Sequence, residues 1–124
     1  MRVSAEQFRA LVSEALDGIP EAFLGYLDTL VVDVEPMPSA RDLAESELDD
    51  PHELLGLYHG TPLTERSVEG PVGLPDRIVI YQNNIQRFCR TRRQIVRQIR
   101  TTVLHEIGHH FGLDEDELDE LGYA

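Results

Sequence analysis

Residues 105–115 read His-Glu-Ile-Gly-His-His-Phe-Gly-Leu-Asp-Glu, an HExxH motif followed by a glycine and two acidic residues. On an α-helix, His105 and His109 lie four residues apart, so both imidazoles project from the same face. Two imidazoles on one helix face can bind a single metal ion. Glu106 lies beside them, where its carboxylate can accept a proton from a metal-bound water. The motif therefore predicts a metal site with a general base.

Chance does not explain this string, because HExxH arises in only about 2% of shuffled chains of this composition. The added glycine and acid make a coincidence rarer still. Gly112 suits the end of the helix, since a residue without Cβ adopts a left-handed conformation at little cost. The chain can turn back there and bring a third ligand towards the metal.

The third ligand is expected to be a carboxylate. The metzincin pattern has a third histidine ten residues after the first, and here Glu115 occupies that position, with Asp114 before it. Carboxylates bind zinc at about 2.0–2.2 Å, so the replacement is chemically sound. Spacing favours Glu115 and leaves Asp114 as the alternative. The chain is not a strict metzincin, because a metzincin has a methionine turn after the motif, whereas Met1 and Met37 both precede it.

Length and charge indicate a small acidic protein. The chain has 124 residues and a net charge of −12, which suits a single domain over residues 1–124. The negative charge argues against nucleic acid or an anionic membrane as a partner. No apolar run is close to the length of about 20 residues that a membrane-spanning helix needs. Cys89 is the only cysteine, so no internal disulfide can form and a cytoplasmic protein is expected. A small buried side chain is its expected role.

The basic residues are concentrated in one stretch. All eleven are arginines, and six lie within residues 87–100, which contain no acid. We expect these guanidiniums to pair with the protein's own carboxylates; a basic patch for an acidic ligand is the alternative.

The pattern of apolar residues predicts an α+β order of elements. Capping-box patterns at Ser4 and Thr91 predict that a helix begins after each of these residues. The first helix is expected to end near Gly18. The second is expected to run to about Phe111 and to carry the motif. β-branched or apolar runs predict strands over residues 30–35, 53–58 and 77–81. Shorter helices are expected over 21–27, 41–46, 83–89 and 114–121.

The motif helix is predicted to be two-sided. Its core face comprises Val96, Ile99, Val103, Leu104, Ile107 and Phe111, while Gln98 and Thr102 share the open face with the two motif histidines. His110 points away from the metal direction and is expected to pack. His52 and His59 are expected on the surface or in a strand, with a position lining the cleft as the alternative for His59. Tyr123 is expected to pack on the last helix rather than to bind an oxyanion.

Residues 54–66, 74–81 and 102–112 together resemble the small bacterial zincin-like metallopeptidase family. This resemblance covers about the last 70 residues. It implies a minimal α+β zincin-like domain in which a small mixed sheet packs on a long active-site helix. It also implies an acidic third ligand, usually Asp in the family, where this chain has Glu115 after Asp114.

The hypothesis that follows is a zinc-dependent metallopeptidase. His105, His109 and Glu115 or Asp114 would hold Zn²⁺, while Glu106 would accept a proton from the bound water and pass it to the leaving amine. The resemblance implies that the strand over residues 77–81 is the edge on which an extended peptide pairs. Because a small scaffold implies an open cleft, we expect peptides or unfolded proteins as substrates, or a protein partner that completes the cleft.

The alternative is a non-catalytic zinc-binding or protein-interaction module with a zincin fold. A structural zinc site is closed by four protein ligands, and Asp114 and Asp116 are available near the motif. Glu106 argues against this alternative, because a general base next to the metal has no role in it.

Overall fold

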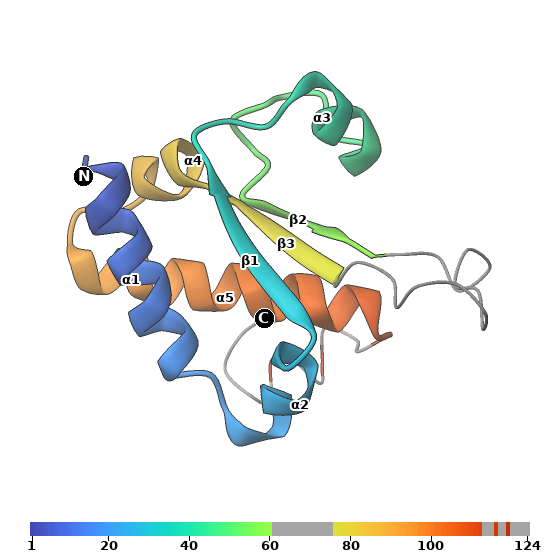
Figure 1. The fold of residues 1–124 in the computed structure, drawn as a ribbon. Coiled ribbons are helices and arrows are strands. Elements are labelled where there is room, and N and C mark those ends of the chain that lie inside the picture. Colours follow the sequence, from blue (N-terminus) through green and yellow to red (C-terminus); the bar gives the residue numbers. More distant parts are fainter. Residues whose placement is uncertain (61–75, 113–115, 117–118, 120–124) are drawn as a thin grey trace.

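The computed structural model describes residues 1–60, 76–112, 116 and 119 (Figure 1). The predicted helix over 114–121 falls almost entirely outside these residues, as does Tyr123. The described elements follow the predicted α+β order. They are α1 (Ala5–Asp17), a 3-10 helix (Glu21–Phe23), α2 (Leu24–Leu27), β1 (Leu30–Glu35), α3 (Ala40–Ser46), β2 (Gly56–His59), β3 (Asp76–Tyr81), α4 (Gln82–Arg87) and α5 (Arg92–His110).

Both long helices begin at the predicted caps. The Ser4 hydroxyl accepts the Gln7 N–H at 3.0 Å, and the Gln7 side chain accepts the Ser4 N–H at 3.0 Å, which completes a capping box. At α5, the Thr91 hydroxyl accepts the Gln94 N–H at 3.1 Å, but the Gln94 side chain accepts from Arg90 instead of Thr91. The start of α5 is therefore confirmed, with a cap that differs from the predicted box.

The three strands formed by the described residues make a small mixed sheet in the order β1-β3-β2. β1 runs parallel to β3, with Val32 opposite Ile78, whereas β2 runs antiparallel to it, with Leu57 opposite Val79. The prediction that residues 77–81 form the sheet edge is therefore wrong, because β3 is the central strand. Its apolar run is covered on both faces, and Ile78, Val79 and Ile80 are all 0% exposed. The edge beside the motif helix is β2.

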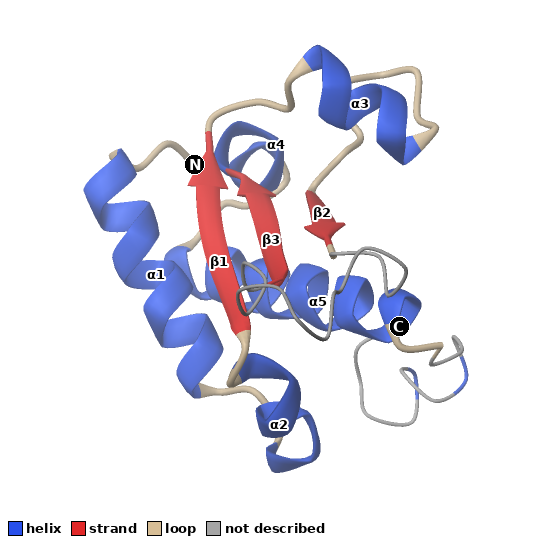
Figure 2. Ribbon diagram, turned by 45° about the vertical axis from the view of Figure 1, so that its right-hand side comes forward, coloured by secondary structure: helices blue, strands red, loops and turns tan. Residues whose placement is uncertain are grey.

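The main core lies between the sheet and the helices α1 and α5. Figure 2 shows α1 alongside the strands and α5 crossing them, and the buried side chains of both helices join those of β3 in one cluster. Cys89 belongs to this cluster, as predicted, and burial raises the pKa of its thiol. A smaller cluster of Leu54, Leu57, Val79 and Tyr81 lies on the other face, towards α3.

Two predictions about the faces of α5 are wrong. Thr102 was expected on the open face but is only 6% exposed, because β2 covers it at Gly56. Phe111 was expected in the core but is 46% exposed. It follows the last residue of α5, where its ring contacts Tyr26 and Tyr58 instead of the main core.

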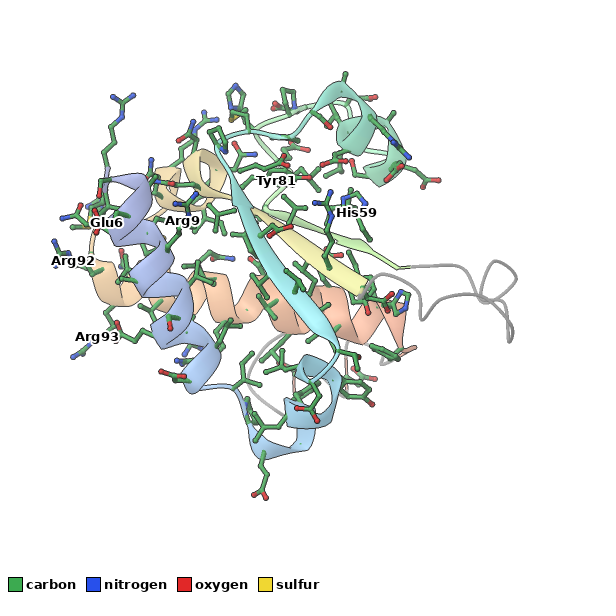
Figure 3. All side chains as sticks on the ribbon, in the orientation of Figure 1. Glu6, Arg9, His59, Tyr81, Arg92 and Arg93 are labelled. Carbon is green, nitrogen blue, oxygen red and sulfur yellow. The ribbon has the colours of Figure 1, made fainter. Side chains whose placement is uncertain are left out.

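The arginine-rich stretch is largely exposed. Arg92 and Arg93 point outward at the start of α5 (Figure 3). Among the described residues, none of the six arginines forms an ion pair with a carboxylate, so the predicted pairing is not found there. Arg100 instead donates from Nε to the Ala15 carbonyl at 3.0 Å, in the last turn of α1, where the helix dipole favours a cation.

A membrane span was not expected from the sequence. No helix formed by the described residues is both long enough and apolar enough to cross a bilayer.

Candidate metal centre

The motif histidines lie near the C-terminal end of α5, where the helix emerges from the core. His105 is half-buried and His109 is exposed. Their ring centroids are 5.6 Å apart, and the ring planes meet at 88°. Two imidazoles that bind one ion at about 2.0–2.1 Å have centroids about 5–6 Å apart. The pair therefore fits a shared metal ion.

Glu106 lies between α5 and the edge strand β2. The N–H of Tyr58 donates to its Oε2 at 3.3 Å. Burial raises the pKa of Glu106 above its ordinary value, while the hydrogen bond from Tyr58 and the nearby His109 act in the opposite direction. A carboxylate with a raised pKa is a stronger base, which suits a group that must accept a proton and return it.

β2 can lie close to α5 only because of a glycine. A Cβ added to Gly56 would meet Thr102 Cγ2 at 2.7 Å and the Val79 carbonyl oxygen at 3.2 Å. Two residues further along β2, the backbone N–H of Tyr58 lies within hydrogen-bonding distance of Glu106. The close approach of the strand at Gly56 makes this contact possible. The sequence indicated a strand here, but not that its backbone would position the predicted base.

The end of the motif helix is held by aromatic contacts. The ring of His110 stacks on Tyr58 with centroids 3.9 Å apart and an angle of 14°, and its edge meets Phe111 at 4.9 Å. Phe111 in turn contacts Tyr26 at 4.5 Å. His110 is exposed, but its ring stacks on Tyr58, which agrees with the packing role predicted from its direction on the helix.

The predicted turn after the helix is present. Gly112 has a φ of 78°, in the left-handed region that a glycine adopts at little cost. Asp114 and Glu115, the two possible third ligands, lie outside the described residues, so the choice between them stays a prediction.

A second group of possible ligands was missed by the sequence analysis. Asp42, Glu45 and His59 lie together on the α3 side of the sheet. His59 had been given a surface or strand role, and no spacing rule links a strand residue to a helix so far from it in sequence. The spacing of Asp42 and Glu45 on one helix face was the only local signal.

The family model described as zincin-like metallopeptidase matches residues 27–123. The chain therefore belongs to the zincin-like metallopeptidase family, whose members typically bind a metal ion. No curated protein matches this sequence. The family match confirms the resemblance seen in the sequence, and the small mixed sheet beside the long helix α5 is the fold that the resemblance implied.

Proposed function

We propose that this protein is a zinc-dependent metallopeptidase that hydrolyses peptide bonds with Glu106 as its general base. The observation that carries the proposal is the position of Glu106. It follows His105 directly in the sequence, beside two histidines whose spacing fits one ion. Its burial raises its pKa, and the backbone of an edge strand holds its carboxylate.

The donor set fits zinc, because two imidazoles and one carboxylate are the ligands of several catalytic zinc sites. His105 and His109 would supply the nitrogens, and Glu115 or Asp114 the oxygen. Zinc bound there would supply an acidified water and a Lewis acid for the scissile carbonyl. The protein's own part is to hold these ligands and to move the proton.

Glu106 performs the proton transfer in this proposal. Tyr58 N–H holds its Oε2, which leaves Oε1 as the atom that accepts the proton from the attacking water. The same carboxyl group then donates the proton to the leaving amine. The raised pKa of Glu106 favours both proton transfers, because a general acid-base group works best when its pKa is close to the operating pH.

The edge strand β2 is the expected binding site for an extended peptide, in place of β3. Among the strands that the structure describes, β2 pairs with β3 alone, and the backbone N–H of Tyr58 points away from β3, towards Glu106. Because antiparallel pairing alternates, the backbone of Gly56 also faces away from β3. Because Glu106 accepts the Tyr58 N–H, a peptide at this edge would pair through the backbone of Gly56 and lie over α5 near Glu106. Peptides or unfolded proteins are the proposed substrates.

The test is turnover of a broad peptide library by zinc-loaded protein, with the zinc content of each sample measured. Glu106→Gln should keep its zinc and lose about 10²–10⁴-fold in turnover, because only the general base is removed. Glu14→Gln, an exposed change on α1, is the matched control and should behave as wild type. Wild type that holds zinc and cleaves nothing would instead indicate a non-catalytic zinc-binding or protein-interaction module.

A further inference from the structure

Asp42, Glu45 and His59 form a compact group on the face of the sheet that points away from α5. Asp42 and Glu45 lie one turn apart on α3, and His59 is the last residue of β2. One ligand atom from each lies within 4.8 Å of the others. His59 Nε2 is 3.5 Å from Asp42 Oδ1, and His59 Nδ1 is 3.6 Å from Glu45 Oε2.

The carboxylate at the centre of this group is buried and held in place. The side chain of Asp42 is only 9% exposed. Its Oδ2 accepts the Tyr81 hydroxyl at 2.7 Å, which leaves Oδ1 facing His59. Burial and the bond to Asp42 both raise the pKa of Tyr81, so its hydroxyl stays protonated and remains a donor. Metal-binding carboxylates are commonly oriented by such a hydrogen bond.

The imidazole of His59 provides an independent observation. Its Nε2 is buried and has no hydrogen-bond partner among the described residues. The 3.5 Å to Asp42 Oδ1 exceeds the usual length of such a hydrogen bond. A buried nitrogen without a partner costs free energy, and a metal ion would remove that cost. Ligand atoms in a tetrahedral site with bonds of about 2.1 Å lie about 3.4 Å apart, close to the 3.5 Å between His59 Nε2 and Asp42 Oδ1. Glu45 Oε2 lies beside the other ring nitrogen, so the half-exposed Glu45 side chain must turn towards Nε2 to bind the same ion.

We propose that Asp42, Glu45 and His59 form a second metal site, which binds a transition-metal dication such as Zn²⁺. Two carboxylates and a neutral imidazole balance the charge of a dication. The imidazole favours a transition metal over Ca²⁺ or Mg²⁺, which prefer oxygen ligands alone. The site ties α3 to the edge strand.

This site is separate from the motif. Successive side chains of a strand point to opposite faces, and Tyr58 packs towards α5 while His59 faces α3. The bound ion therefore acts on the same strand that positions Glu106, from the opposite face. The proposal does not depend on peptidase activity.

The test uses the full chain with His105→Ala and His109→Ala together, so that the motif histidines cannot bind. This metal-free double variant is titrated with Zn²⁺ by calorimetry, and its melting temperature is followed. We expect one equivalent of zinc and a melting temperature that rises by several degrees on binding. No zinc binding by the folded double variant would overturn the proposal.

Further substitutions in the double variant assign the ligands. His59→Ala should abolish binding, and Glu45→Gln, a half-exposed change that spares the core, should weaken it at least tenfold. The matched controls are His52→Ala and Glu53→Gln, both at exposed positions outside the group, and they should bind as the double variant does. Zinc binding that survives both His59→Ala and Glu45→Gln would show that the ion lies elsewhere and refute the assignment.

Discussion

Glu106 is under two opposing demands. Its function as a base requires it to be ionised at neutral pH, whereas its partial burial favours the protonated form and raises its pKa. The hydrogen bond from Tyr58 compensates in part, because it stabilises the charged carboxylate. A residue placed in this way reduces the stability of the folded protein in return for reactivity.

The first prediction concerns the stability of the metal-free protein. Because the folded pKa of Glu106 is raised, the folded state holds its proton more tightly than the unfolded state, so stability falls as pH rises through the folded pKa. Glu106→Gln avoids this loss and keeps an acceptor for Tyr58. Its melting temperature should exceed that of wild type at pH 7.

The difference should shrink as the pH approaches about 4.3, the ordinary value for glutamic acid, because both states of wild type then take up the proton. Thermal unfolding of the chelated wild type and of chelated Glu106→Gln, followed from pH 7 down to about pH 4.3, measures this difference in melting temperature. A Glu106→Gln protein less stable than wild type at pH 7 would show that the charged carboxylate is favourable in this position.

At the scale of elements, β2 links the two parts of the molecule that matter for function. Its α5 side contributes the Tyr58 N–H to Glu106 and the ring that stacks on His110. Its other side contributes His59 to the group beneath α3. Small shifts of this short strand therefore affect both sites.

The second prediction tests the close approach of β2 to α5. In Gly56→Ala, the new Cβ would contact a stiff β-branched side chain, Thr102, and the backbone of Val79. The strand must shift outward, at a cost of about 1–3 kcal/mol in stability, and turnover should fall because Tyr58 moves away from Glu106. Chemical denaturation and peptide turnover measure the two effects.

The matched control is Gly25→Ala in α2, where an added Cβ meets nothing within 4 Å. This change should leave turnover intact. If Gly56→Ala matched Gly25→Ala in both stability and turnover, neither the fold nor the activity would require the close contact between β2 and α5.

At the scale of the whole molecule, the main core contains neither of the motif histidines. Most of its buried side chains come from α1, β3, α4 and α5 and form one continuous cluster, which includes Phe8, Ile78, Ile85, Ile99 and Leu104. The motif histidines lie at the margin of this cluster, since one is half-buried and the other exposed.

The third prediction follows from this arrangement. Chelation should abolish peptide turnover while the circular dichroism spectrum and cooperative unfolding persist, with a lower melting temperature. Added zinc should restore the activity. Loss of the native spectrum on chelation would instead favour the alternative of a structural zinc site closed by four protein ligands.

Elements were predictable from sequence because their signals are local. The caps at Ser4 and Thr91, the spacing of apolar residues and the β-branched runs depend on neighbours along the chain, and the structure confirms the elements that they predicted within the described residues. The motif histidines share a helix face for the same reason.

Features that depend on contacts between distant segments were missed. The central position of β3, the cover of Thr102 by Gly56 and the meeting of Asp42 with His59 all result from strand order. The apolar run of Ile78, Val79 and Ile80 was the one available hint, because a strand without polar alternation is covered on both faces.

The central claim is an open zinc site on α5, and a crystal structure of the zinc-loaded protein, with anomalous diffraction at the zinc edge, tests it most directly. The account predicts zinc bound by His105, His109 and one carboxylate, with a water at the remaining position on the side of Glu106. Zinc held there by four protein ligands, or no zinc between the two histidines, would contradict it.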